Sequence, residues 1–221
     1  MTTLVDYISK RLTEFGRITQ DRRPSLERLA TLIAGRRTTS RDTKVVFVCT
    51  HNSRRSQLAQ VWATAAAYHF AIAGIDALSA GTRATKVDRR ALETLERAGF
   101  TWTQSNGHNP TCTVRIGSTD QTLPLFSKTL SDSFEATTDF IAVITCSNAD
   151  LACPVIEGAS DRLSLSYDDP RAADGSSYET DIYDECCRSI SREMLYVFSK
   201  TKRQPTNSAA ASRASDNHAA R

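Results

Sequence analysis

One stretch of the sequence constrains the fold more than any other: an apolar run that leads straight into a cysteine. Residues 45–48 are β-branched or aromatic, which is typical of a buried strand, and Cys49 follows at once. A short polar loop comes next. From about Ser56 apolar residues recur every three or four positions, which predicts a helix. A strand, a tight loop and a helix are therefore predicted to meet at one thiol.

The loop after this strand has the residues needed to hold an oxyanion. Its backbone N–H groups can curl around a tetrahedral anion, and they would stabilise a thiolate at Cys49 in the same way. Arg55, six positions later, can add a bidentate guanidinium contact. Asn52 suits a left-handed backbone position, and Ser56 can donate its hydroxyl to the thiolate. The other candidate oxyanion-binding positions of the loop are Thr50, His51, Ser53 and Arg54.

The spacing of Cys49 and Arg55 is a weak signal by itself, because Cys186 and Arg192 share it. No strand pattern precedes Cys186, and the residues around it read as a helix. The alternative for Cys49 is a small buried apolar residue at a strand end. The agreement of strand, loop, arginine and helix favours the nucleophile.

The composition of the 221-residue chain allows one sizeable domain with extensions. No apolar run is long enough to span a membrane, and the first residues lack the pattern of a secretory signal. Six cysteines are too sparse for a disulfide scaffold. The net charge of +3 comes from arginines and lysines without interleaved aromatics, a poor nucleic-acid footprint. We expect a cytoplasmic protein with reduced thiols and with neither a membrane nor a nucleic-acid partner.

The segments outside the expected catalytic domain can also be described from the sequence. Residues 1–40 predict a helical hairpin whose second helix ends at Gly35. A β-hairpin insertion is expected near residues 103–126, with Pro124 favouring an edge strand. Residues 201–221 are polar and rich in Ala and Ser, which predicts a disordered tail.

Within residues 44–200 strands and helices alternate, which predicts an α/β fold: a doubly wound parallel sheet with helices on both faces. Further strands are expected at residues 75–79, 140–144 and 162–166. Ligands of such sheets bind beyond the carboxyl ends of the strands. Cys49, Cys146 and Asp169 each follow a predicted strand, so we expect them to converge there.

The loop sequence Cys-Thr-His-Asn-Ser-Arg-Arg-Ser-Gln resembles that of low-molecular-weight protein tyrosine phosphatases and of the thioredoxin-coupled arsenate reductases built on the same fold. The likeness extends to residues 79–82, 126–129, 145–154 and 168–170. It implies that Cys49 is the nucleophile, that Arg55 and the loop amides hold the substrate oxygens, and that Asp169 is the general acid. Two alternatives stay open: Asp168 could be the acid, or Asp169 could be a turn residue before proline.

Cys146 and Cys153 distinguish the two branches of the family. In the reductases that the chain resembles, one thiol forms an arseno-adduct, a second attacks the first, and a third closes a disulfide that thioredoxin reduces. Cys146 matches the second thiol and Cys153 the third; their alternative role is that of buried packing residues. Ordinary phosphatases of this fold do not need that pair.

We therefore expect an arsenate reductase-like enzyme that acts on arsenate, uses thioredoxin and needs no cofactor. The alternative is hydrolysis of phosphotyrosine or small aryl phosphates through a phosphocysteine intermediate. A non-catalytic oxyanion-binding module is disfavoured because Cys49, Arg55 and Asp169 are all intact.

Three positions depart from the family pattern. His51 stands where glycine is common, and Arg54 stands where a cysteine is common. Gln60 stands where some reductases carry a glutamate that helps to hold a potassium ion. For this reason no metal site is predicted.

Overall fold

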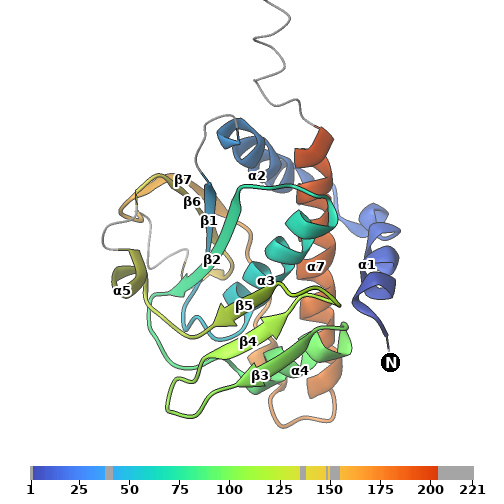
Figure 1. Ribbon diagram of the computed structural model, residues 1–221, viewed down its shortest axis with the longest axis vertical. Coiled ribbons are helices and arrows are strands. Elements are labelled where there is room, and N and C mark those ends of the chain that lie inside the picture. Colours follow the sequence, from blue (N-terminus) through green and yellow to red (C-terminus); the bar gives the residue numbers. More distant parts are fainter. Residues whose placement is uncertain (1, 38–41, 135–137, 148, 150–154, 204–221) are drawn as a thin grey trace, which may run out of the picture.

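A parallel four-stranded sheet forms the centre of the protein in the computed structural model, which describes residues 2–37, 42–134, 138–147, 149 and 155–203 (Figure 1). The strands, in the order β2-β1-β6-β7, are Ile75–Gly81, Thr43–Cys49, Phe140–Ile144 and Ala159–Ser164. All three neighbouring pairs are parallel. β1 is central and buried on both faces, which explains its continuous apolar run. The doubly wound α/β prediction is confirmed.

The two faces of the sheet carry cores of different size. Alternate residues of β1 point to opposite sides, so Val45 and Phe47 join the larger core, whereas Val46 and Val48 join the smaller one. The larger core contains Trp62 and the rest of the inner face of α3 (Arg55–His69), together with α7 (Glu179–Arg203). On the other side lies α5 (Leu130–Phe134), which contacts β2 (Figure 1).

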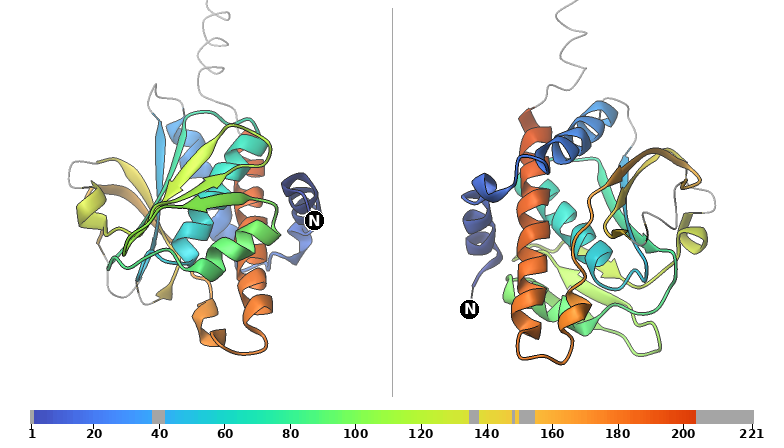
Figure 2. Two further views of the ribbon diagram at one scale, coloured as in Figure 1. Left: turned by 60° about the horizontal axis from the view of Figure 1, so that its bottom comes forward. Right: turned by 180° about the vertical axis from the view of Figure 1, so that it is seen from behind.

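The N-terminal extension forms two helices that flank α7 (Figure 2). They are α1 (Leu4–Leu12) and α2 (Arg23–Arg36), joined through the 3-10 turn η1 (Phe15–Arg17). Both expected helices are present, but each packs mainly on α7 rather than on its partner. The prediction that Gly35 ends the second helix is wrong: α2 continues to Arg36. Glycine inside a helix costs only about 1 kcal/mol relative to alanine, which the packing of α2 on α7 outweighs.

The insertion is a three-stranded antiparallel sheet of β3 (Thr101–Gln104), β4 (Cys112–Arg115) and β5 (Thr122–Leu125). Pro124 lies on the edge strand β5, as predicted. β3 was not predicted, because this short edge strand is largely exposed and shows no apolar alternation. It follows α4 (Arg89–Arg97) and contacts that helix.

The predicted tail begins too early. Residues 201–203 form the last turn of α7, and Thr201 is buried. Its Oγ1 lies 3.4 Å from the carbonyl oxygen of Ala30 in α2 and 3.0 Å from that of Val197. Contact with α2 thus orders residues whose composition alone suggested a tail. Residues 204–221 lie outside the described part of the chain.

Across the described ranges, no helix combines the length and the apolar character needed to cross a lipid bilayer.

Candidate active site

The oxyanion loop (residues 49–56) connects the carboxyl end of β1 to the first turn of α3. Cys49 is buried, and its Sγ lies 3.1 Å from Ser56 Oγ. Asn52 has φ +44°, the left-handed conformation expected for it, and its side-chain amide donates to Ser56 Oγ over 2.9 Å. Because Asn52 occupies an acceptor position on Ser56, the hydroxyl proton of Ser56 is free to point at the sulfur.

The carbonyl groups of the loop are bonded to donors outside it. The carbonyl of Thr50 accepts from the N–H of Arg83 over 2.8 Å, and that of His51 accepts from Ser127 Oγ over 2.9 Å. Within the described chain, none of the hydrogen bonds uses the N–H groups of residues 50–55. The backbone N–H groups of the loop are therefore available to bind an anion, as an oxyanion-binding loop requires.

Gly81 makes room for this arrangement. It pairs with Cys49 across the sheet, and its N–H donates to the carbonyl of Lys128 over 2.9 Å. A Cβ added to Gly81 would lie 2.7 Å from the backbone nitrogen of Asn52 and 3.0 Å from the carbonyl oxygen of Thr50. Any side chain at this position would push the loop backbone.

Asp169 is held by both arginines of the loop. Arg55 Nη2 lies 2.6 Å from Asp169 Oδ2, and Arg54 Nε lies 3.1 Å from Asp169 Oδ1. Arg55 also donates through Nη1 to the carbonyl of Tyr167 over 2.9 Å. Asp168 is exposed, whereas the Asp169 side chain faces the loop and also caps the 3-10 turn η2 (Pro170–Ala173). The geometry brings Asp169, rather than Asp168, to the loop.

Arg54 has a different environment from the one suggested by its sequence position. The sequence predicts an oxyanion-binding role for it, but its guanidinium bridges two carboxylates: Asp169 and, through Nη1 at 3.0 Å, Asp88. The imidazole of His51 lies near the same charged residues. Its partial burial, with the nearby guanidinium groups of Arg54 and Arg171, lowers the pKa of the imidazole, which is therefore mainly neutral at pH 7.

Cys146 lies beside the oxyanion loop. Its Sγ is buried, 3.5 Å from the Oγ1 of Thr50, the residue after Cys49. The N–H of Ala149 donates to the same sulfur over 3.4 Å. The structure thus places the second predicted thiol against the residue that follows the first. Cys153 lies outside the described residues, so the pairing of Cys146 with Cys153 stays a prediction.

The other three cysteines that the structure describes form no hydrogen bond with residues 49–56. Cys112 is buried in the insertion, on strand β4. Cys187 is buried in α7, where the Nε1 of Trp62 donates to its sulfur over 3.2 Å. Cys186 precedes it, 4.0 Å from the carbonyl oxygen of Asp168. Gln60 is also buried and accepts from Ser79 Oγ over 2.6 Å.

Three residues of the site were missed in the sequence. Asp88 caps α4, and an aspartate just before a helical pattern was its available signal. Tyr167 acts through its carbonyl, which no residue pattern reveals. The N–H of Lys128 donates to Asn52 Oδ1 over 3.0 Å, and burial lowers the pKa of its amine to about 8.

The model of the low molecular weight phosphotyrosine protein phosphatase family matches residues 44–205. The chain belongs to this family. An arsenate reductase of Bacillus cereus strain G9842 is 27% identical over 148 residues, which are 67% of this chain and 91% of that protein. A second Bacillus cereus arsenate reductase is 27% identical over 157 residues, 71% of this chain and 94% of that protein. The protein is thus an enzyme of the arsenate reductase or tyrosine phosphatase type.

Solved structures agree on the fold. A mutant of YwlE from Bacillus subtilis matches with a TM-score of 0.51 at 17% identity, over 73% of this chain and 100% of that one. The family match leaves residues 1–43 outside, so the N-terminal helices are an addition to the family domain.

Proposed function

We propose that this enzyme reduces arsenate with a cysteine relay that starts at Cys49. The observation that carries the proposal is the position of Cys146, whose buried thiol lies 3.5 Å from the Oγ1 of Thr50 in the loop of the nucleophile. A phosphatase needs no second thiol there. The two arsenate reductase relatives support the same branch.

In the first step the Cys49 thiolate attacks arsenic, and a protonated oxygen of arsenate leaves as water. The loop amides, Arg55 and the Ser56 hydroxyl at 3.1 Å from the sulfur stabilise the charges involved. Asp169 supplies the proton to the leaving oxygen. The product is an arsenate ester of the Cys49 sulfur, in which arsenic is still pentavalent.

In the second step the Cys146 thiolate attacks the Cys49 sulfur. The electron pair of the sulfur–arsenic bond goes to arsenic, which leaves as trivalent arsenite, and a Cys49–Cys146 disulfide forms. Cys153 then attacks Cys146, which frees Cys49 and leaves a Cys146–Cys153 disulfide. A dithiol reductant such as thioredoxin returns the two electrons. This cycle requires a reducing compartment such as the cytoplasm.

Hydrolysis of phosphotyrosine or small aryl phosphates is the second candidate. Asp169 suits this reaction as well, because a protonated carboxyl group at the edge of the oxyanion loop can donate its proton to an ester oxygen. Cys49 would then form a phosphocysteine that water hydrolyses, and neither Cys146 nor Cys153 would take part.

One experiment separates the two activities. The purified full chain is given arsenate with a thioredoxin system, and p-nitrophenyl phosphate in a parallel assay. Cys49→Ser should abolish both reactions, whereas Cys146→Ser and Cys153→Ser should abolish only arsenite formation. Arsenate without reductant should convert two thiols into a Cys146–Cys153 bridge, visible by mass spectrometry. If every thiol stays free, or if both serine variants reduce arsenate at the wild-type rate, the phosphatase function takes its place.

A further inference from the structure

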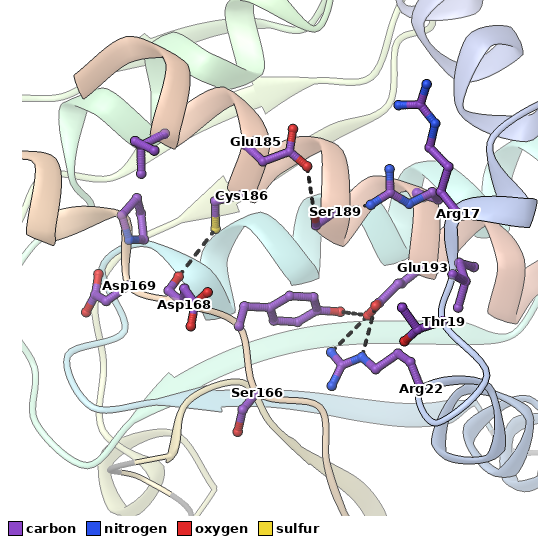
Figure 3. A pocket seen from close by; sticks show the side chains of 15 residues that line it. Arg17, Thr19, Arg22, Ser166, Asp168, Asp169, Glu185, Cys186, Ser189 and Glu193 are labelled. Atoms are coloured by element: carbon purple, nitrogen blue, oxygen red, sulfur yellow. Dashed lines mark hydrogen bonds and ion pairs between the residues drawn. The ribbon is translucent and has the colours of Figure 1, made fainter. Parts of the chain in front are cut away.

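A cavity of about 480 Å³ lies where the N-terminal extension meets the segment that carries Asp169 (Figure 3). The extension contributes Arg17 and Arg22 to the wall, and α7 contributes Glu193. Tyr167 completes the wall from the Asp169 segment. Residues outside the matched family domain thus reach the edge of the candidate active site.

Tyr167 connects this cavity to the oxyanion loop. On one side its carbonyl accepts from Arg55 Nη1 over 2.9 Å. On the other side its hydroxyl donates to Glu193 Oε2 over 2.6 Å (Figure 3). Burial, followed by the nearby Glu193 carboxylate, raises the pKa of Tyr167 well above its ordinary value, so the hydroxyl keeps its proton and stays a donor. The hydrogen bond to Glu193 therefore fixes the position of Tyr167. The position of Tyr167 in turn sets where its carbonyl meets Arg55.

Glu193 is in turn held by Arg22. The guanidinium of Arg22 makes a bidentate contact, with Nε 2.9 Å from Oε1 and Nη2 2.9 Å from Oε2 (Figure 3). The same guanidinium lies over the Tyr167 ring, 4.9 Å from its centroid. Glu193 is 8% exposed, so its charge needs this partner.

We propose that the N-terminal extension positions Arg55 for oxyanion binding through the chain Arg22–Glu193–Tyr167. The proposal rests on the oxyanion site of the proposed function. Arg55 has two anchors, Asp169 and the Tyr167 carbonyl. A bound oxyanion competes with Asp169 for the guanidinium, and the Tyr167 carbonyl is then the anchor that keeps Arg55 aimed at the ligand. Arg22, Glu193 and Tyr167 are positioning residues, since none of them touches the substrate.

Removal of Arg22 should therefore weaken oxyanion binding at a distance. Without it, the buried Glu193 carboxylate loses its counter-charge, and the hydrogen bond that holds Tyr167 is disturbed. Because Arg55 itself is intact, the expected effect is moderate, about 3- to 30-fold in affinity.

The test measures the binding of inorganic phosphate to the full chain by calorimetry, together with thermal unfolding. Arg22→Met and Tyr167→Phe should each weaken phosphate binding by about 3- to 30-fold. The double variant should be no weaker than the worse single variant, because both changes break the same chain. Arg22→Lys, which keeps the charge but not the bidentate contact, should recover part of the affinity.

Arg17→Met is the matched control. Arg17 lines the same cavity, but its side chain is 72% exposed and lies 4.0 Å from Glu14, a different carboxylate. Phosphate affinity should not change in this variant. If Arg22→Met does not fold, Glu193→Gln and Tyr167→Phe carry the same test.

Two results would overturn the proposal. One is unchanged phosphate affinity in Arg22→Met with a lowered unfolding temperature, which would make the contact purely structural. The other is additive losses in the double variant, which would mean that Arg22 does not act through Tyr167. Phosphate binding needs no turnover, so a chain that binds phosphate in the expected pattern but processes neither substrate would refute the proposed function alone.

Discussion

Asp169 and Arg55 form a close ion pair, with 2.6 Å between Oδ2 of Asp169 and Nη2 of Arg55. Asp169, the proposed proton donor, is thus paired with Arg55, the residue proposed to hold the substrate oxygens. Arg54 binds the other carboxylate oxygen and is itself tied to Asp88. When an oxyanion binds Arg55 and displaces Asp169 from its guanidinium, the ion pair with Arg54 can therefore keep Asp169 at the edge of the site.

The first prediction concerns the identity of the acid. Asp169→Asn should slow cleavage of esters with poor leaving groups by about 100- to 10,000-fold, because those oxygens need a proton, and should affect p-nitrophenyl phosphate least. Rates across a series of aryl phosphates measure this. Asp168→Asn is the control, and a larger loss in that variant would assign the acid to Asp168.

A second prediction follows from the two carboxylates on Arg54. Arg54→Met should reduce the rate with poor leaving groups by up to about 100-fold, because Asp169 loses the partner that holds it during substrate binding. The double variant Arg54→Met, Asp169→Asn should be little slower than Asp169→Asn alone. Full additivity of the two changes in kcat would show that Arg54 acts independently of Asp169.

Gly81 provides a prediction about stability. In Gly81→Ala the new methyl group would lie 2.6 Å from the carbonyl oxygen of Arg83 and 2.7 Å from the nitrogen of Asn52, both backbone atoms. We expect the free energy of unfolding to fall by about 1–3 kcal/mol, with weaker phosphate binding. Denaturant unfolding measures the first effect.

Gly35→Ala is the matched control, since nothing lies within 4 Å of the added methyl group in helix α2. It should raise stability by about 0.5–1 kcal/mol. The same change in the free energy of unfolding in Gly81→Ala and Gly35→Ala would contradict the packing described for Gly81.

The fourth prediction concerns thiol reactivity. Burial raises the pKa of Cys186 to about 12 and that of Cys187 to about 11. At pH 8 their thiolate fractions are therefore about one part in a thousand or less, and iodoacetamide should leave both unmodified in the folded protein. Their alkylation should accelerate as the pH rises toward 11. Peptide mapping checks this, with the unfolded chain as the control; rapid modification at pH 8 would contradict it.

The local parts of the fold were predictable from the sequence because each depends on neighbours in the chain. The apolar periods and the loop chemistry of β1, the oxyanion loop and α3 all lie within residues 43–69. The same reasoning placed Asn52 in a left-handed conformation and Pro124 on an edge strand. Parallel order followed from the alternation of strands and helices.

Errors arose where packing overrides local preference. Thr201 belongs to α7 rather than to the tail because it is buried against Ala30 of α2. Gly35 does not end α2, and the last residue of that helix, Arg36, pairs with Asp161 over 2.8 Å. Propensities of 1 kcal/mol or so are smaller than the burial of a helix face.

The sequence alone determined the strand–loop–helix unit around Cys49 and the parallel sheet that contains it, and it led to the expectation that Cys146 would lie near the loop. Tertiary structure decided how the charges pair. Arg54 pairs with Asp88, 34 positions away, and with Asp169, 115 positions away. Arg22 pairs with Glu193, which is 171 positions away. Periodicity carries no information about which of several arginines and carboxylates meet, because ion pairs form wherever the packing of helices brings opposite charges together.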